Sequence, residues 1–198
     1  GYCQENLKEK KKEDLPTIGD WVLARKPENL ERSKVLIERV LARRNVLART
    51  EIGQEKRQQL MAANIDRVFI VSGLDKEFNP RKIERYLLLC WSLGLEPVIV
   101  LNKADLIKNP ESALKKARAI AGEVPILFLS TLTRTGEEPF LSHFKTGSTN
   151  IFLGSSGVGK SSISNMILGH ENFLTGPVRD KDGKVRHTTS YRELILTD

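Results

Sequence analysis

The segment Gly154–Ser161 reads G-S-S-G-V-G-K-S and fits the pattern G-x-x-x-x-G-K-[ST], which constrains the fold more than any other part of the chain. An apolar run, Asn150–Leu153, precedes it, and a helical pattern, Ser162–Leu168, follows it. In this setting glycines let successive backbone N–H groups point inward at a phosphate, and the helix dipole points there too. The sequence therefore predicts a phosphate-binding loop at a strand end in an α/β domain.

Each position of this loop is a candidate for contact with a bound nucleotide. Lys160 binds the phosphates with a point charge between the β- and γ-positions, which makes it the catalytic candidate, and the Ser161 hydroxyl is placed to coordinate Mg²⁺. A glycine-rich turn without function is the alternative, and the flanking strand and helix argue against it. The remaining contacts are predicted for Gly154, Ser155, Ser156, Gly157, Val158, Gly159 and Ser162.

Three further apolar runs resemble the one before the loop: Arg67–Val71, Pro97–Leu101 and Ile126–Leu129. Short, nearly continuous apolar runs are typical of strands buried on both faces of a parallel sheet. Helical patterns alternate with them, the first opened by Pro80 and the second lying between Pro110 and Gly122. This alternation predicts a layered α/β domain with its ligand at the carboxyl ends of the strands.

A second motif, Asn102-Lys103-Ala104-Asp105, directly follows one of these runs and matches the N-K-x-D pattern of GTPases. Guanine differs from adenine in its N1–H and exocyclic amine, and the Asp105 carboxylate can accept both. Asn102 is predicted to reach the base edge or to tie its loop to the phosphate loop, and the Lys103 stem to lie flat over the ring. Turn and cap roles are the alternative for this motif taken alone.

A third segment, Ser130-Thr131, follows the next run, where GTPases carry a loop whose backbone N–H meets the guanine carbonyl. The order of the motifs is unusual, because Asn102 precedes Gly154 whereas small GTPases ordinarily begin with the phosphate loop. The same sheet can form if the native termini are joined and the chain is opened elsewhere. We therefore predict an α/β fold over residues 61–198, a circularly permuted P-loop GTPase domain with GTP or GDP and Mg²⁺ as cofactors.

Residues 1–60 read as a small all-β domain. Short strands are predicted at Trp21–Arg25, Val35–Leu41 and Val46–Thr50, and Lys8–Asp14 is too charged to bury and is expected to be mobile. Trp21 is expected to pack in or near a core, with contact to RNA as the alternative. The net charge of +7 favours an anionic partner such as RNA, with a solvated basic surface as the alternative.

A polar loop near the end of the chain, Asp180–Thr189, precedes a predicted strand, Arg192–Leu196. Such a loop fits a switch segment in which a threonine hydroxyl completes Mg²⁺ coordination. Thr188 and Thr189 are both catalytic candidates; Thr189 is taken as the metal ligand while Thr188 stays open, and a plain surface loop is the alternative. The D-x-x-G motif that should follow is not in the chain, so we expect this piece to bind nucleotide better than it hydrolyses it.

These features together resemble the RsgA (YjeQ) family, circularly permuted GTPases of small ribosomal subunit biogenesis. Besides the motif order, the resemblance rests on Gly19–Val22, Ala42–Asn45, Ala63–Val68 and Arg186–Thr189. It implies an amino-terminal OB-fold, incomplete here, that contacts ribosomal RNA, and a zinc-binding carboxy-terminal domain outside this chain. It also implies GTP hydrolysis stimulated by the small ribosomal subunit, with His187 as a catalytic candidate or a loop or RNA-facing residue.

Other classes of protein fit the sequence poorly. No apolar run approaches the roughly 20 residues that cross a bilayer, no secretory signal opens the chain, and two cysteines make neither a disulfide framework nor a metal site. A cytoplasmic monomer without a membrane partner is expected. An RNA-binding module whose affinity is switched by guanine nucleotide, with incidental turnover, is the alternative function. An ATP-using kinase is disfavoured because Asp105 mismatches the adenine edge.

Overall fold

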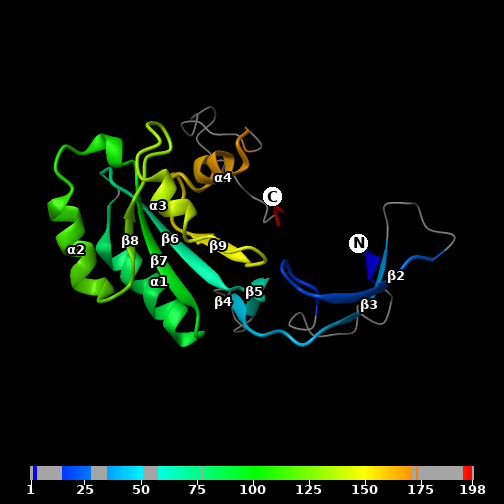
Figure 1. The fold of residues 1–198 in the computed structure, drawn as a ribbon. Coiled ribbons are helices and arrows are strands. Elements are labelled where there is room, and N and C mark those ends of the chain that lie inside the picture. The colour runs from blue at the N-terminus through cyan, green and yellow to red at the C-terminus, as the bar shows by residue number, and fades with distance from the viewer. Residues whose placement is uncertain are drawn as a thin grey trace, which may run out of the picture. The chain divides into compact units, whose positions relative to one another are not determined.

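The structure of the chain is a computed structural model that describes residues 2–3, 15–27, 35–50, 58–76, 78–170, 173 and 194–197. The chain divides into two compact units (Figure 1). The smaller comprises Gly1–Ile65 with Arg192–Leu194, and the larger comprises Asp66–Tyr191 with Ile195–Asp198. Each unit is described by itself below.

The larger unit is built on a four-stranded parallel sheet with the strand order β8-β7-β6-β9. Its strands lie where the four apolar runs predicted them, and β6 and β7 are buried along most of their length, as continuous apolar runs require. The α/β prediction is confirmed. The strands are β6 (Arg67–Gly73), β7 (Glu96–Asn102), β8 (Ile126–Phe128) and β9 (Asn150–Leu153).

The helices of this unit also follow their sequence signals. Pro80 opens α1 after the Asn79 side chain accepts the Arg81 N–H at 3.0 Å, and Gly122 and Gly169 end α2 and α4 with positive φ. The short α3 was not predicted, because five residues carry no helical stripe. The elements are α1 (Pro80–Ser92), a 3₁₀ helix (Ala104–Leu106), α2 (Glu111–Ala121), α3 (Glu137–Leu141) and α4 (Lys160–Leu168).

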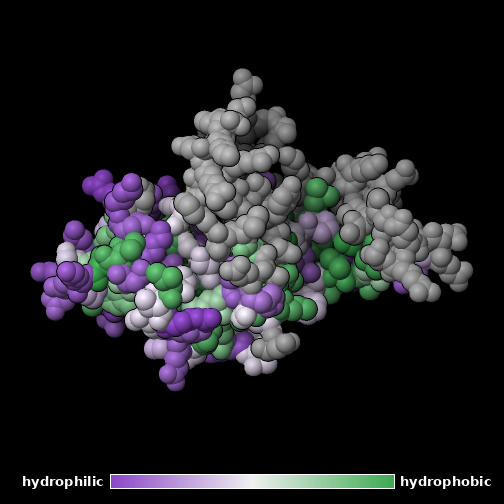
Figure 2. Space-filling model, turned by 90° about the horizontal axis from the view of Figure 1, so that it is seen from above, coloured by the Kyte–Doolittle hydropathy of each residue, from purple (hydrophilic) through white to green (hydrophobic). Residues whose placement is uncertain are grey.

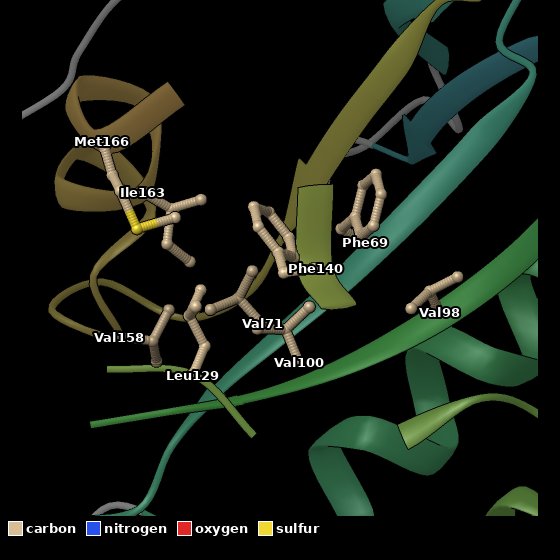
Figure 3. Close-up of a cluster of buried hydrophobic side chains, with 9 residues drawn as sticks. All are labelled: Phe69, Val71, Val98, Val100, Leu129, Phe140, Val158, Ile163 and Met166. Atoms are coloured by element: carbon tan, nitrogen blue, oxygen red, sulfur yellow. The ribbon is translucent and has the colours of Figure 1, made fainter. Parts of the chain in front are cut away.

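The core lies on both faces of this sheet because successive side chains of a strand point to opposite sides. On one face, side chains from β6 and β7 pack against α3, the phosphate loop and α4 (Figure 3). An aromatic group anchors this face: Phe69 lies with its ring centroid 4.8 Å from Phe144 and 5.3 Å from Phe140. The buried cluster comprises Phe69, Val71, Val98, Val100, Leu129, Phe140, Val158, Ile163 and Met166.

Helices α1 and α2 contact each other, and α1 also contacts β6 and β7. Helix α1 buries Ile83, Leu87 and Cys90, and α2 buries Ala117 and Ala121, so each helix presents one apolar stripe inward. Hydrophilic side chains gather at the left of Figure 2, over α2. None of the helices in the described part of the chain is long and apolar enough to cross a membrane.

The smaller unit contains a three-stranded sheet, in the order β1-β3-β2, and an antiparallel pair, β4-β5. The three predicted strands are confirmed as β2, β3 and β4, and the OB-fold stays a prediction. Trp21 is 72% exposed, so the expectation that it packs in or near a core was wrong; it precedes β2 and the described strands leave it uncovered. The elements are β1 (Tyr2–Cys3), β2 (Val22–Arg25), β3 (Leu36–Val40), β4 (Val46–Thr50) and β5 (Gln58–Ala63).

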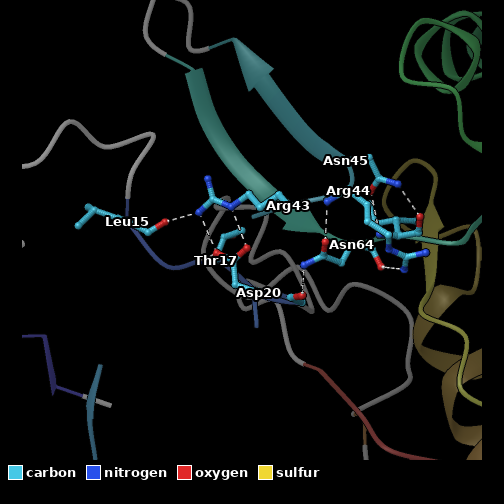
Figure 4. A network of polar contacts seen from close by, with 9 residues as sticks. Leu15, Thr17, Asp20, Arg43, Arg44, Asn45 and Asn64 are labelled. Carbon is cyan, nitrogen blue, oxygen red and sulfur yellow. Dashed lines mark hydrogen bonds and ion pairs between the residues drawn. The ribbon is translucent and has the colours of Figure 1, made fainter. Parts of the chain in front are cut away.

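A buried ion pair organises one end of this unit (Figure 4). Arg43 donates from Nε and one Nη to the two oxygens of Asp20, each at 2.8 Å, and the Asp20 side chain is only 1% exposed. The Leu15 carbonyl accepts a further hydrogen bond from Arg43, and the Thr17 N–H donates to Asp20. The bidentate geometry explains why the sequence places this acid and this arginine here.

A second part of the same network surrounds Asn64, which is 4% exposed and has φ +56°. Its side chain accepts the Arg44 N–H at 2.9 Å and donates to the Gly19 carbonyl at 2.9 Å. The Asn45 side chain bonds both the N–H and the carbonyl of Ile65, each at 2.8 Å. These hydrogen bonds join three segments that are distant in sequence, around Gly19, Arg44–Asn45 and Asn64–Ile65.

One prediction in the carboxy-terminal segment does not hold. Of the predicted strand Arg192–Leu196, the described residues 194–196 have no regular secondary structure. Leu194 is 57% exposed and Leu196 is 89% exposed, so this apolar alternation has no sheet to pack on among the described residues. The predicted switch residues Thr188 and Thr189, together with His187 and the charged segment Lys8–Asp14, lie outside the described residues.

Candidate functional site

The predicted phosphate loop connects β9 to α4, with Gly159 as the residue before the helix. Gly157 and Gly159 have φ of +77° and +98°, a region that disfavours side chains. A Cβ on Gly154 would lie 2.4 Å from the Val71 carbonyl oxygen, and one on Gly159 would lie 2.2 Å from the Asn102 amide nitrogen. The glycines of the motif are thus required both by backbone conformation and by close approach.

Lys160 begins α4 and folds back over the loop. Its ammonium donates to the carbonyl of Gly154 at 3.0 Å and to that of Ser155 at 2.7 Å. Desolvation by burial lowers the pKa of Lys160 below its ordinary value, because removing the ammonium from water disfavours its charged form. Ser161 and Ser162 follow in the first turn and are half-buried, whereas Ser156 and Gly157 are exposed at the loop tip.

The side chain of Asn102, at the end of β7, joins the base motif to the phosphate loop. Asn102 is 1% exposed, and its amide nitrogen donates to the Val158 carbonyl at 2.8 Å. Among the described residues its Oδ1 finds no hydrogen-bond donor. The sequence left two roles open for Asn102, contact with the base edge or a tie to the phosphate loop. The structure contains the tie to the phosphate loop, and the Asn102 side chain keeps one buried acceptor, Oδ1.

The predicted base-reading carboxylate lies at the same edge of the sheet. Asp105 is exposed, and one of its oxygens accepts a hydrogen bond from the Ser130 hydroxyl at 2.5 Å. Ser130 is fully buried, and its hydroxyl also accepts the Thr133 N–H at 3.2 Å. Thr131 is half-buried in the same turn. The third segment, weak as a sequence motif, is therefore in direct contact with the second.

Two residues at this edge of the sheet lie outside the three sequence motifs and were not predicted. Gly136 has φ +77°, and a Cβ there would lie 1.9 Å from the Phe128 carbonyl oxygen, so it lets the turn after Ser130 close. Asp75, just after β6, forms an ion pair with Lys103 at 2.6 Å. The position of Asp75 four residues after the predicted strand Arg67–Val71 is the one signal in the sequence that could have drawn attention to it.

The chemistry of this edge suits an anionic ligand with a polar ring. Glycines leave space for it at the loop tip, where nothing lies within 4 Å of a Cβ built on Gly157, and the amino end of α4 is favourable for negative charge. Asp105 offers an exposed acceptor at the other end. No group of three His, Cys, Asp or Glu side chains that could hold a metal occurs in the described ranges.

Cys90 is buried in α1, away from this edge, and burial raises the pKa of its thiol to about 11.

Comparisons with known proteins show which family the chain belongs to. The RsgA GTPase family model matches residues 40–198. The chain is 43% identical over 178 residues to the small ribosomal subunit biogenesis GTPase RsgA of Leptospira interrogans, covering 90% of this chain and 49% of that protein. For the protein of the same name in Methanosarcina acetivorans the identity is 41% over 182 residues, with coverages of 91% and 48%. The chain thus spans about half the length of the curated relatives it matches.

Two crystal structures share the fold. YjeQ from Thermotoga maritima has a TM-score of 0.62 and 30% identity, covering 83% of this chain and 55% of that one. YloQ, described as a circularly permuted GTPase, has a TM-score of 0.58 and 22% identity, with coverages of 84% and 54%. The likeness to YloQ concerns the fold alone. Given the family match over most of its length and these close relatives, the chain belongs to the RsgA GTPase family.

Proposed function

We propose that this chain is the guanine-nucleotide-binding part of a GTPase that acts in assembly of the small ribosomal subunit. The observation that carries the proposal is the hydrogen bond from Asn102 to the Val158 carbonyl, because it couples the base motif to the phosphate loop. The Ser130–Asp105 contact supports it, since it leaves the second Asp105 oxygen and one acceptor lobe for the guanine donors. The names of the relatives supply the ribosomal context.

The hydrolytic part of the proposal rests on Lys160 and Ser161. Lys160 is held beside the loop by the carbonyls of Gly154 and Ser155, where its charge would stabilise the developing negative charge on a transferred phosphoryl group. Ser161 would hold Mg²⁺, which supplies charge neutralisation to the phosphates when bound. Thr188 or Thr189 would complete that coordination. These residues would orient the phosphates and stabilise the developing charge.

The proposed RNA partner rests on the smaller unit and on charge. Its predicted OB-fold would contact ribosomal RNA, and two features support this: the chain carries a net charge of +7, and Trp21 is 72% exposed next to a strand that ends in Arg25. An exposed tryptophan can stack on an unpaired base. Mg²⁺ and guanine nucleotide are the cofactors proposed for this chain, and the zinc that the resemblance implies would lie in a domain outside it.

Competitive binding of GDP, ADP and XDP to the chain tests the nucleotide assignment. We expect GDP to bind more tightly than ADP by at least about 100-fold, because two guanine donors meet Asp105 and an adenine edge would leave that carboxylate unpaired. Asp105→Asn should move the preference toward XDP, whose 2-carbonyl accepts from the new amide. Equal affinity for GDP and ADP, unchanged by the substitution, would reduce the site to a phosphate-binding loop of unknown base preference.

A further inference from the structure

Lys103 holds an unusual backbone conformation at the junction between β7 and the 3₁₀ helix Ala104–Leu106. Its φ is +62° and its ψ is +39°, in the left-handed region that non-glycine residues seldom occupy. Such outliers persist where the surrounding contacts hold them, and they cluster at ligand sites. The conformation ends the strand at Asn102 and turns the backbone at Lys103. The direction of the long Lys103 side chain is then set by the group that binds its ammonium.

The partner that holds it is Asp75. The Lys103 Nζ lies 2.6 Å from Asp75 Oδ2, and the two side chains are 32% and 21% exposed, so this pair is partly shielded from water. Asp75 lies two residues after Gly73, the last residue of β6. Strand β6 lies between β7 and β9, which lead into the base motif and the phosphate loop. Asp75 therefore lies at the sheet edge where both loops begin.

Backbone contacts fix the position of Asp75 relative to the base motif. Gly73 pairs with Asn102 in the parallel register, and the Leu74 N–H donates to the Asn102 carbonyl at 2.8 Å. A Cβ on Gly73 would lie 3.3 Å from the Asp75 carboxylate, so this glycine leaves room for the acid. The turn after β6 is thereby attached to the residue that precedes Lys103.

The geometry points to Asp75 as a positioning residue for nucleotide binding: it anchors the Lys103 ammonium so that the lysine stem is ordered where the purine ring is to lie. The inference rests on the proposed nucleotide-binding function and adds to it a residue outside the three motifs. A free lysine side chain loses much rotamer freedom when it is fixed over a ligand. Because the ion pair already orders Lys103 in the free protein, less of that loss remains for binding.

The test compares GDP affinity in the wild-type chain with Asp75→Asn, Lys103→Met and the double variant. We expect Asp75→Asn to weaken GDP binding by roughly 3- to 10-fold, the range expected when one long side chain is no longer pre-ordered. In the Lys103→Met background, Asp75→Asn should have no further effect, because Asp75 acts through the ammonium that Met lacks. Glu96→Gln is the matched control, since it removes a carboxylate from the Arg67 ion pair at the opposite end of β7 and should leave affinity unchanged.

The outcomes separate this inference from the proposed function. If the wild-type chain prefers GDP to ADP and Asp75→Asn binds GDP as the wild type does, the positioning role is refuted while the function stands. Equal losses from Asp75→Asn in the wild-type and Lys103→Met backgrounds would also refute it, because the acid would then act independently of Lys103. If the wild-type chain shows no preference for GDP, the proposed function itself is wrong. Thermal unfolding of each variant excludes a loss of fold as the cause.

Discussion

Replacing Asn102 by alanine separates the stability of the sheet edge from its ability to bind nucleotide. The substitution removes the 2.8 Å hydrogen bond by which the Asn102 side chain links the base motif to the Val158 carbonyl of the phosphate loop. A buried acceptor left without its donor costs about 1–3 kcal/mol. Asn102 Oδ1, however, already lacks a donor among the described residues, and its removal offsets part of that loss.

The expected loss in unfolding free energy is therefore small, about 1 kcal/mol. The loss in binding is expected to be larger. Without the link, the two loops must be fixed in their relative positions by the nucleotide itself, and a cost of about 1.4–2.8 kcal/mol corresponds to a 10- to 100-fold weaker affinity. Urea unfolding measures the first quantity, and titration with a fluorescent GDP analogue measures the second.

Asn150→Ala is the matched control. Asn150 begins β9, at the opposite end of the sheet from the phosphate loop, and its amide donates locally to Ser148 Oγ at 3.0 Å. Its Oδ1 also lacks a donor among the described residues, so the same chemistry is deleted at a site that no ligand should reach. We expect its GDP affinity to match the wild type. An Asn102→Ala affinity within about twofold of the wild type, or equal losses in both variants, would refute the coupling of the two loops.

Three further predictions follow from the same contacts. Gly159→Ala should abolish GDP binding and lower the unfolding free energy by about 2 kcal/mol or more, since its φ is +98° and the new Cβ has no room. Gly94→Ala is the control, because Gly94 has φ +63° but open space around it. In the same urea titrations it should show only the cost of the strained backbone, about 1–2 kcal/mol. Asp20→Asn should cost about 3 kcal/mol because it removes the charge of a carboxylate that is 1% exposed and binds Arg43 with both oxygens, whereas Glu38→Gln in an exposed pair should cost under about 0.5 kcal/mol; similar values for the two would contradict the burial argument. Burial lowers the pKa of Lys160, and a bound phosphate favours the charged ammonium, so GDP binding should take up protons as the pH rises from that lowered pKa toward 10.5. Calorimetry in buffers of different ionisation enthalpy measures this uptake, and Lys160→Arg, which stays charged, should show less of it.

The parts of the fold that the sequence could predict are those specified by local chemistry. Strands buried on both faces must be apolar throughout, so β6 and β7 were located to within two residues at each end. The start of α1 was predicted from Pro80, and the structure adds Asn79 as its cap. The phosphate loop around Lys160 was likewise predicted from the sequence, because a loop that wraps a phosphate needs particular residue types at fixed positions.

The parts that could not be predicted depend on contacts between distant residues. Nothing near Asp75 in the sequence indicates that Lys103, 28 positions later, pairs with it. Gly136 is required by the Phe128 carbonyl, which only the folded turn brings within 1.9 Å of a Cβ. Trp21 was assigned to packing because an alternating strand does not reveal which of its faces is covered, and the structure leaves it 72% exposed.

The motif order of this chain is compatible with the site because the geometry depends on which strands are neighbours. The residues of the Asn102–Val158 hydrogen bond are 56 positions apart, yet they meet because β7 and β9 both pair in parallel with β6 and end at the same edge. In a parallel sheet the loops at the carboxyl ends of the strands face the same ligand, whatever the order of the strands along the chain. Any chain order that keeps β7, β6 and β9 adjacent would retain this contact. Permutation therefore changes which strand ends the chain must connect, and it leaves unchanged the edge at which the phosphate loop and the base motif meet.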